Sequence, residues 1–491
     1  MNGREKYKIV LLTACLLFLF MPLFQAFLHF TEEKPLVGAY AKSKDTTFNI
    51  TAWFESTYQK LKEVHLNQNF GFRTHYVRLN NQIDYSCFDK SNAENVVVGK
   101  RGFLYTGEYI NAYFGNNFIG KQSLEERFKK LKTVQDVLAS QGILLEVVFA
   151  PGKATFYPEY IPDLWITEKK LTNYSYASEL CKNYGVNFMD FNAWFLKQKE
   201  ITPYDLYPKT GIHWSNYGSL LAMDSLKNHI EKNSTLNLRD FAIDNIGFSD
   251  SLLSPDNDLG ETMNLLWNVK VLPMPYANYH WLDDNGKVKP KALFIGDSYF
   301  WNMYYQGLIS NIFTDCKFWY YNETVYPESE PERKVKNLNL SEEIKKQQVI
   351  VLMATESNVH DIGWGFVEDC YELFKNELSI AFRKRIYVRQ ILESISGNKQ
   401  WMSEIEKKAK DNKVSIEEMM KMDAVYVFDV DYNTPEVRAL LDETVDRIKK
   451  TENWIKDIQL KAKEKNLPVD EMIEMDAKYI YDTELKKNKK N

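Results

Sequence analysis

The chain has 491 residues, which is long enough for two or three structural units. Hydrophobic residues make up 44% of it, so the composition supports a large core and is not that of a disordered protein. The net charge of −5 provides no basic field, and we therefore expect no nucleic acid among the partners.

The N-terminal segment predicts a membrane anchor. Arg4, Lys6 and Lys8 precede an apolar run at residues 9–30, which as a helix would span roughly 33 Å, enough for a bilayer core. The basic flank predicts a cytoplasmic N-terminus, with the chain after about residue 35 outside the cytoplasm. The alternative is a cleaved signal peptide, but the run is long for one and no clear cleavage site follows it.

Residues 36–95 show no strong periodicity, whereas apolar strands and helices alternate from Ser123 onward. A capping box at 123–126 predicts a helix to about Gly142, and further helices are expected near 168–184 and, with Ser215 as N-cap, at 216–231. The predicted core strands lie at 143–149, 186–191, 291–295 and 349–353. This alternation predicts a doubly wound, mainly parallel α/β sheet.

The last hundred residues are charged and helical, and they contain an internal repeat. Trp401, Ile405 and Ala409 recur as Trp454, Ile458 and Ala462, an offset of 53 residues that also relates 422–426 to 475–479. The four-residue spacing places these side chains on one helix face, which favours a packing module over a protein- or glycan-binding module. We therefore expect an anchor at 1–35, an α/β domain at 36–385 and a helical region at 386–491 with repeats at about 398–431 and 451–484.

The five cysteines, at positions 15, 87, 181, 316 and 370, form no C-x-x-C motif. Disulfides among the four outside the apolar run are possible in an oxidising compartment, although none is required. Asp256 and Asp258 suggest either a cation site or a turn, and the missing downstream Glu of an EF-hand loop favours the turn. We expect neither a metal nor a cofactor, because no phosphate loop, dinucleotide fingerprint or H-E-x-x-H motif is found.

Ser298 is the candidate nucleophile. It belongs to a Gly-Asp-Ser turn between the strand at 291–295 and a helix-like segment at 300–309. A serine at such a turn projects its hydroxyl from the carboxyl edge of the sheet, and the following helix N-terminus can supply N–H groups to an oxyanion. The same tripeptide is also common in ordinary turns.

His213 is the candidate general base. It precedes the predicted helix at 216–231 and could take the Ser298 proton and later return it. The alternative is a structural histidine that hydrogen-bonds beside Trp214. His360, which follows the strand at 349–353, is the second candidate base.

Over roughly residues 65–380 the chain resembles the alginate O-acetyltransferase type of SGNH-like proteins. The resemblance rests on five short segments in the family's order: the aromatic-Arg segment at 69–73, Val-Gly-Lys-Arg-Gly-Phe-Leu-Tyr at 98–105, the Pro-x-Lys segment at 149–158, His213-Trp214, and Gly-x-Ser at 296–298. It implies an SGNH-hydrolase-like fold with a Ser/His centre that takes an acyl group and passes it to a polysaccharide hydroxyl. It also implies a single-pass protein of the bacterial inner membrane with a periplasmic main domain. A multi-span membrane acyltransferase would be its partner and acyl donor.

We therefore expect Ser298, His213 and Asp297 to be catalytic, and Lys153, Trp214 and Tyr299 to bind substrate. One departure from the family pattern bears on this hypothesis, because the Asp two residues before the histidine is Gly211 here. An imidazole without an orienting carboxylate loses control of its tautomer, which can cost orders of magnitude in rate. The sequence offers, as replacements, Asp190, Asp205, Asp256, Asp258 and Asp297.

Three functions remain open from the sequence. The leading hypothesis is O-acetyl transfer to an extracytoplasmic or cell-surface polysaccharide through an acyl-Ser intermediate. The same residues could instead hydrolyse glycan acetyl esters. A catalytically weakened glycan-binding or assembly protein is the third possibility, and Gly211 favours it.

Overall fold

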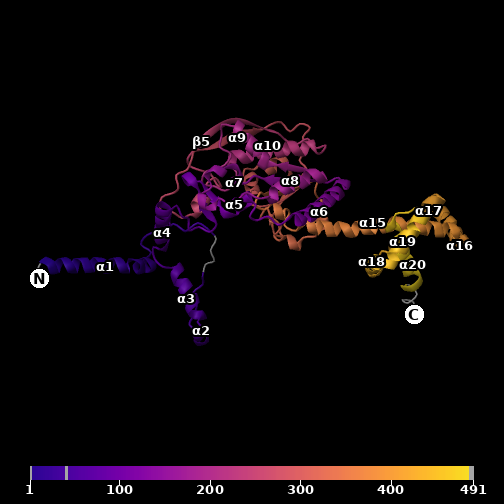
Figure 1. The fold of residues 1–491 in the computed structure, drawn as a ribbon, viewed down its shortest axis with the longest axis horizontal. Coiled ribbons are helices and arrows are strands. Elements are labelled where there is room, and N and C mark those ends of the chain that lie inside the picture. Colours follow the sequence, from indigo (N-terminus) through magenta and orange to yellow (C-terminus); the bar gives the residue numbers. More distant parts are fainter. Residues whose placement is uncertain (1–2, 39–42, 486–491) are drawn as a thin grey trace. The chain divides into compact units, whose positions relative to one another are not determined.

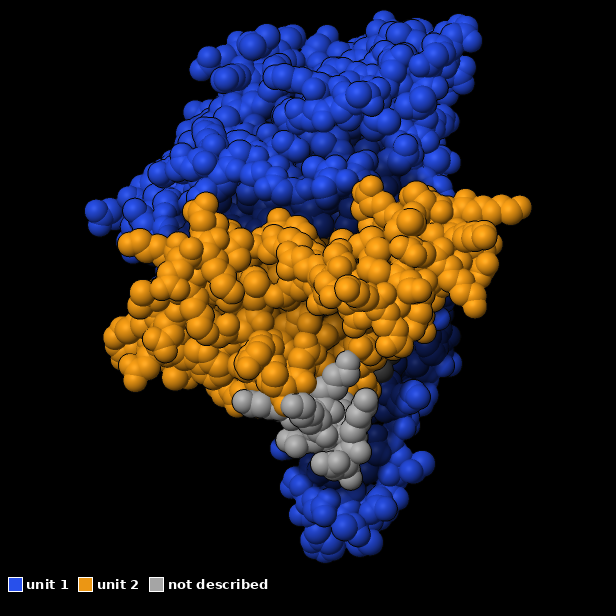
Figure 2. Space-filling model, turned by 90° about the vertical axis from the view of Figure 1, so that its right-hand side faces the viewer, with its two compact units in different colours: residues 1–370 blue, residues 371–491 orange. Residues whose placement is uncertain are grey.

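The computed structural model describes residues 3–38 and 43–485. These divide between two compact units, residues 1–370 and residues 371–491 (Figure 2). The second unit begins at residue 371, before the expected boundary at 385/386. Both positions lie within one helix, α15 (Phe366–Gly397), so no break in secondary structure marks the boundary.

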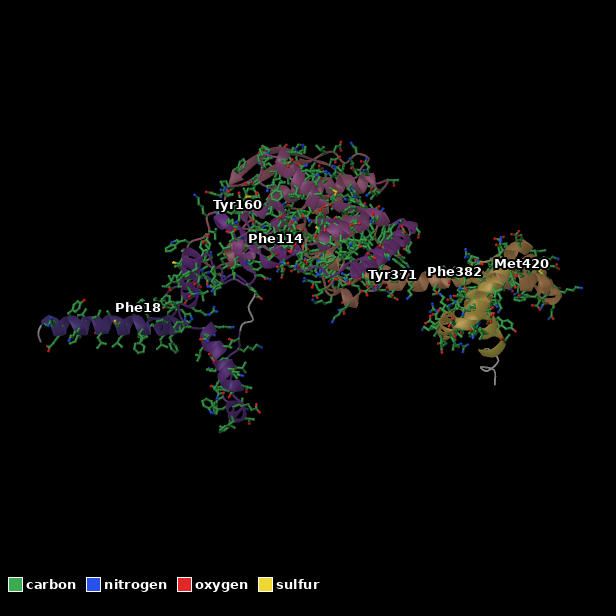
Figure 3. The ribbon with its side chains drawn as sticks, viewed as in Figure 1. Phe18, Phe114, Tyr160, Tyr371, Phe382 and Met420 are labelled. Atoms are coloured by element: carbon green, nitrogen blue, oxygen red, sulfur yellow. The ribbon has the colours of Figure 1, made fainter. Side chains whose placement is uncertain are left out.

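Helix α1 (Gly3–Leu28) is long and apolar enough to cross a membrane, which makes it a candidate anchor or signal segment. Most of its large apolar side chains are exposed, and Phe18 projects away from the helix (Figure 3). Three further helices follow where we predicted no regular element: α2 (Ile50–Phe54), α3 (Thr57–Gln68) and α4 (Arg73–Phe88). All side chains of α2 and α3 are at least partly exposed, so neither helix needs the apolar stripe on which the prediction depended.

A six-stranded sheet forms the centre of the first unit (Figure 1). In spatial order its strands are β4 (Phe188–Asp190), β3 (Leu144–Ala150), β10 (Val349–Thr355), β7 (Lys291–Gly296), β8 (Thr314–Tyr320) and β9 (Thr324–Tyr326). Neighbouring strands are parallel except β8 and β9, which pair antiparallel at one edge. Every residue of β10 is buried, as expected for a central strand covered on both faces. The predicted doubly wound, mainly parallel sheet is therefore confirmed.

The larger helices of this unit pack around the sheet. They are α6 (Lys121–Ser140), α8 (Asn173–Tyr184), α9 (Phe191–Ile201) and α10 (Asn216–Lys232). Alternate residues of β10, such as Val351 and Met353, share a core with Met223 and Leu226 of α10. The N-cap prediction for α10 is confirmed, because Ser215 Oγ accepts a hydrogen bond from Gly218 N. The predicted capping box at Ser123 is wrong, since α6 begins at Lys121 after Gly120.

Short elements connect this framework. They are β1 (Val96–Val98), β2 (Leu104–Thr106), α5 (Gly107–Phe114), α7 (Lys153–Phe156), α12 (Phe300–Tyr305), α13 (Leu308–Ile312), α14 (Leu340–Lys345) and the 3₁₀ turns η1 (Lys100–Gly102), η2 (Pro158–Tyr160), η3 (Asp163–Trp165), η4 (Val335–Asn337) and η5 (Val359–Asp361). A hairpin of β5 (Phe241–Ser249) and β6 (Met274–Trp281) was not predicted, and its long connection contains α11 (Asp258–Thr262). That connection positions a carboxylate at the candidate site described below.

The second unit is helical and built on the predicted repeat. It contains α16 (Lys399–Asn412), α17 (Ile416–Asp431), α18 (Pro435–Lys450), α19 (Glu452–Glu464), α20 (Val469–Ile480) and the terminal turn η6 (Tyr481–Leu485). Helices α16 and α17 pack together, as do their counterparts α19 and α20. The ion pair between Lys408 and Asp423 recurs at the same offset between Lys461 and Asp476. Each copy is thus a two-helix unit whose repeated apolar side chains lie in one core.

Candidate active site

Ser298 lies at the carboxyl end of β7, in the turn that leads into α12. Its neighbours Asp297 and Tyr299 are buried, whereas Ser298 itself is partly exposed. The preceding Gly296 lies against β10, where an added Cβ would be 3.0 Å from Met353 O. The turn therefore presents the serine hydroxyl at the edge of the sheet where α/β proteins bind their ligands.

His213 connects Ser298 to a carboxylate. Its Nε2 lies 2.9 Å from Ser298 Oγ, and its Nδ1 lies 2.5 Å from Oδ2 of Asp258. The side chains of His213 and Asp258 are 13% and 25% exposed, so the hydrogen-bonded chain is partly shielded from water. A carboxylate, an imidazole and a hydroxyl in this order can activate the hydroxyl as a nucleophile.

The Asp258 carboxylate is held by the backbone on the side away from the imidazole. Its Oδ1 accepts hydrogen bonds from Ile212 N at 2.9 Å and from Leu259 N at 2.7 Å. Oδ2 is left to accept from the Nδ1–H of His213, which favours the tautomer in which Nε2 is the acceptor for the Ser298 hydroxyl. Of the five carboxylates that the sequence offered as replacements, Asp258 is thus the one bonded to the imidazole.

Gly211 explains why the carboxylate comes from another part of the chain. A Cβ at this position would be 2.9 Å from Pro255 O, 2.9 Å from Asp256 O and 2.8 Å from Pro208 Cγ. The connection that carries Asp258 therefore fills the space that a side chain at position 211 would need. The absence of a side chain at position 211 thus allows the segment with Asp258 to pack beside the histidine loop.

The three side chains expected to bind substrate are fully buried and hold the histidine loop instead. Lys153 Nζ donates to Lys209 O at 2.9 Å and to Gly211 O at 2.6 Å. Tyr299 donates its hydroxyl to Ile212 O, and the indole N–H of Trp214 donates to Tyr299 O. The expectation that these residues contact substrate is therefore corrected: each is closed off from the surface, and together they fasten residues 209–214 to the turn at Ser298.

Burial also changes the acidity of Lys153. Removing its ammonium group from water lowers its pKa to about 7, although the nearby charge of Asp258 acts in the opposite direction. The lysine is therefore not a solvated cation that could attract an anionic sugar.

Asp297, expected to be catalytic, binds the neighbouring strand end and not the imidazole. Its Oδ2 accepts from the N and Oγ1 of Thr355, each at 2.8 Å, and from Asn358 Nδ2 at 2.9 Å. It therefore joins the ends of β7 and β10, and the catalytic assignment is corrected to a structural role.

The remaining candidates from the sequence have other partners. Asp190 accepts from the hydroxyl of Tyr174, and Asp205 accepts from that of Tyr157. Asp256 accepts from Asn216 N, and burial raises its pKa to about 6. His360, the second candidate base, does not line the pocket that contains Ser298.

The N-terminus of α12 does not offer the free N–H groups expected for an oxyanion. Tyr299 N donates to Asp297 Oδ1 at 3.2 Å and Phe300 N to Asp297 O at 3.3 Å. Trp301 N donates to Ser298 O at 3.2 Å. These contacts close the turn that carries the candidate nucleophile Ser298. The helix ends at Tyr305 and is therefore shorter than the expected 300–309.

Ser298 and His213 open into a pocket of about 540 Å³. Its other lining residues are Asn216, Leu253, Ser254, Pro255, Asp258, Trp301, Asn302, Tyr305 and Gln306. In the described part of the chain no group of three or more His, Cys, Asp or Glu side chains could hold a metal ion, and the five cysteines are unpaired.

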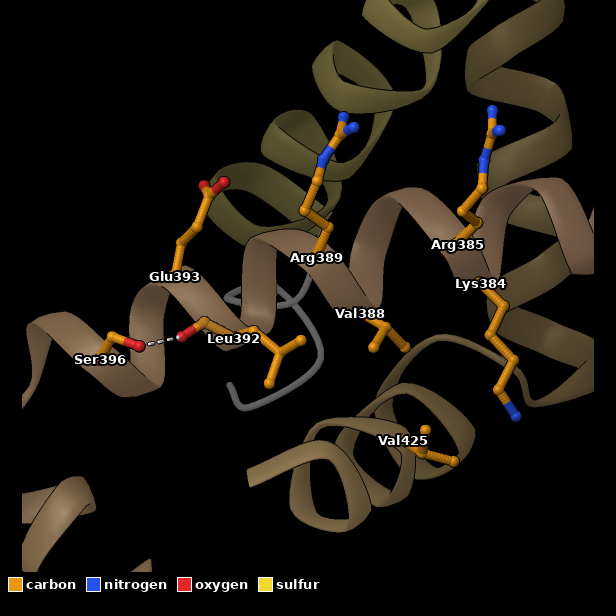
Figure 4. Close-up of a pocket in the computed structure, with 8 residues that line it drawn as sticks. All are labelled: Lys384, Arg385, Val388, Arg389, Leu392, Glu393, Ser396 and Val425. Atoms are coloured by element: carbon orange, nitrogen blue, oxygen red, sulfur yellow. Dashed lines mark hydrogen bonds between the residues drawn. The ribbon is translucent and has the colours of Figure 1, made fainter. Parts of the chain in front are cut away.

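A second hollow lies in the helical unit and is lined mainly by residues of α15. Figure 4 shows Val388 and Leu392 on the side of α15 that faces Val425, while Arg385 and Arg389 project from the other side of the helix. Both arginines pair with Glu471, each at 2.9 Å, so their charges are engaged within the unit.

Comparison with known proteins identifies the domain that contains this site. Residues 96–304, which include His213, Asp258 and Ser298, match the family model described as SGNH hydrolase-like domain, acetyltransferase AlgX. This segment is an SGNH hydrolase-like domain. A search of curated proteins gave no significant match to the chain.

Solved structures similar to the chain share few residues with it. The O-acetyltransferase domain of Pseudomonas putida AlgJ is 19% identical, with 57% of this chain and 99% of that chain covered and a TM-score of 0.40. Pseudomonas aeruginosa AlgX is 14% identical, covering 56% and 68% with a TM-score of 0.37. Bacillus cereus PatB1 is also 14% identical, covering 54% and 96% with a TM-score of 0.34.

Proposed function

We propose that the SGNH-like domain is an O-acetyltransferase that acts on an extracytoplasmic or cell-surface polysaccharide through an acyl-Ser298 intermediate. The observation that carries the proposal is the hydrogen-bonded chain from Ser298 through His213 to Asp258. It lies within the segment that matches an acetyltransferase family model. Because Asp258 orients the imidazole, Gly211 no longer favours a catalytically weakened protein.

In the first half-reaction Ser298 Oγ attacks the carbonyl carbon of the acetyl donor while its proton passes to His213 Nε2. The bond between the acetyl carbon and the donor oxygen breaks, and the donor leaves with the proton returned by the imidazolium. The negative charge of Asp258 stabilises the imidazolium while it exists. The products are acetyl-Ser298 and the deacetylated donor.

In the second half-reaction the glycan hydroxyl replaces the donor. His213 Nε2 takes the proton of this hydroxyl as its oxygen attacks the acetyl carbon, and the bond to Ser298 Oγ breaks. Ser298 recovers the proton, and the acetyl ester remains on the glycan. The same steps with water as the acceptor would make the protein an esterase, so the acceptor decides between these two activities.

We further propose that α1 anchors the protein in the bacterial inner membrane, with the basic residues Arg4, Lys6 and Lys8 in the cytoplasm and the SGNH-like domain in the periplasm. The apolar length of α1 and its basic flank support this orientation. A multi-span membrane acyltransferase is the proposed acetyl donor partner, which the family resemblance supports. A periplasm-active reporter fused after residue 491 should be active, and an inactive reporter would contradict the orientation.

The proposed activity is tested with the full chain in detergent, an acetylated phenol as donor and oligosaccharides as acceptors, read by mass spectrometry of the glycans. We expect an acetylated oligosaccharide with the wild-type protein and none with Ser298→Ala. Ser310→Ala is the matched control, because Ser310 is an exposed serine of α13 outside the pocket. Release of acetate without any acetylated glycan would instead establish the esterase.

A further inference from the structure

One wall of the pocket at Ser298 is aromatic and is formed by Trp301 and Tyr305. Trp301 and Tyr305, one turn apart on α12, stack with ring centroids 5.1 Å apart and ring planes 17° apart. Phe318 and Tyr326 contact Trp301 edge-on at 4.8 and 4.6 Å, so the indole is held from the sheet side. Tyr305 is 75% exposed although it lines the same pocket as Ser298. The exposed ring of Tyr305, supported by the packed indole, offers an aromatic face against which a flat ligand can pack.

The described residues give the pocket no lysine or arginine side chain. Apart from the phenol of Tyr305, the ionisable residues that line it are His213 and Asp258, and these two are bonded to each other. Proteins bind carboxylates and phosphates through such cations, most specifically through arginine. The negative charge of a ligand with a carboxylate on every sugar would therefore meet no cation in this pocket and would lie near the carboxylate of Asp258.

Uncharged polar groups complete the lining. Asn302 donates through Nδ2 to Trp214 O, and its Oδ1 has no hydrogen-bond partner among the described residues. Asn216, Ser254 and Gln306 contribute further neutral groups. An aromatic wall with a few neutral amides and hydroxyls matches a sugar ring, which offers an apolar face of C–H groups and a rim of hydroxyls.

We propose that the pocket at Ser298 binds a pyranose ring of an uncharged glycan, stacked on the exposed ring of Tyr305 that Trp301 supports from behind, and that it disfavours polyuronates. The inference rests on the proposed function, because it assigns the acceptor class of that same site. Leu253 and Pro255 also line the pocket and add apolar surface for the ring or its neighbour in the glycan.

The test measures binding and does not depend on catalysis. The full chain carrying Ser298→Ala in detergent is titrated with three probes of equal length: cellohexaose, maltohexaose and hexagalacturonate. We expect at least one neutral probe to bind about tenfold more tightly than the uronate. Adding Tyr305→Ala should weaken that binding by about tenfold, the size expected for the loss of one stacked ring. Trp267→Ala is the control, because Trp267 is an exposed aromatic residue (72%) outside the pocket.

Three results would overturn the inference. They are equal or tighter binding of hexagalacturonate, no binding of either neutral probe, and neutral binding that Tyr305→Ala leaves unchanged. The aromatic wall could instead hold an acyl chain. In that case Tyr305→Ala, made in the protein that retains Ser298, would change the ratio of turnover between 4-nitrophenyl hexanoate and 4-nitrophenyl acetate, and glycan binding would stay the same. Failure of Ser298 to form an acyl intermediate would remove the proposed function, whereas the binding result would stand on its own.

Discussion

The Nδ1 atom of His213 lies 2.5 Å from Oδ2 of Asp258, a residue 45 positions further along the chain. The family pattern seen in the sequence would have placed this carboxylate two residues before the histidine, where Gly211 stands. Here the connection between β5 and β6 fills the space beside Gly211 and supplies the carboxylate itself. The imidazole is oriented in the same way by a group from a different part of the fold.

Asp258→Asn should lower kcat by about 10²–10⁴-fold with little change in KM, because the amide no longer fixes the imidazole tautomer or stabilises its charged form. The substitution keeps an oxygen that can accept from Ile212 N and Leu259 N. Steady-state turnover of 4-nitrophenyl acetate measures the effect. Asp250→Asn, an exposed position on the same β5–β6 connection, is the control. Equal activity of both variants would contradict the assignment of Asp258.

Gly211→Ala should reduce activity although it adds a single methyl group. The new Cβ would lie 2.9 Å from the carbonyl oxygens of Pro255 and Asp256, so the connection that carries Asp258 must move. For the same reason Gly211→Asp should not restore activity to Asp258→Ala. Activity assays of the single and double variants, with circular dichroism to verify folding, provide the measurement. Recovery in the double variant would mean that position 211 can still accept the family's carboxylate.

Lys153→Met should destabilise the domain by about 1–3 kcal/mol, because Gly211 O and Lys209 O both lose a buried donor. Activity should fall as well, since the histidine loop is no longer held. Lys209→Met is the matched control, because Lys209 takes part through its backbone carbonyl. Denaturant unfolding of the two variants is the measurement. A substrate-binding lysine would instead give unchanged stability and a raised KM.

The buried carboxyl of Glu356 should make stability depend on pH. It accepts a hydrogen bond from Thr155 Oγ1, and burial raises its pKa to about 7. Between pH 4.5 and 7 the folded protein therefore retains a proton that the unfolded chain releases, and stability falls as pH rises through this window. The cost at pH 8 is about 3 kcal/mol at most.

Glu356→Gln removes that titration. Its melting temperature relative to wild type should therefore rise from pH 4.5 to pH 7 and stay level above it. The exposed Glu94→Gln serves as control. A constant difference between Glu356→Gln and wild type at all pH values would show that this carboxyl does not titrate in the window.

Much of the framework could be predicted from the sequence because buried parallel strands have continuous apolar sequences. The strands at 291–295 and 349–353 are predicted in this way, and the position of Ser298 after the first of them indicates the edge of the sheet at which the candidate site lies. Helices α2 and α3 could not be found, because their exposed side chains leave no periodic stripe. The hairpin of β5 and β6, which has few buried side chains, was missed for a similar reason.

The candidate site was predicted only in part. Ser298 and His213 stand in short motifs, whereas Asp258 lies in a segment that reads as a turn, and its partner is fixed by tertiary packing alone. The signal that could have found it was Gly211 itself, since a lost carboxylate implies a replacement nearby. Lys153, Trp214 and Tyr299 carry polar groups that suggest substrate contacts, but a sequence does not reveal that such groups are buried and bonded to backbone carbonyls.

The most direct test of the central claim is acid-quenched mass spectrometry of the full chain after brief incubation with 4-nitrophenyl acetate, followed by peptide mapping. We predict one acetyl group on the peptide that contains Ser298 and none in Ser298→Ala, with much slower formation in His213→Ala. An acetyl group on another residue, or neither adduct nor released nitrophenol from folded protein, would contradict the assignment of Ser298 as the nucleophile.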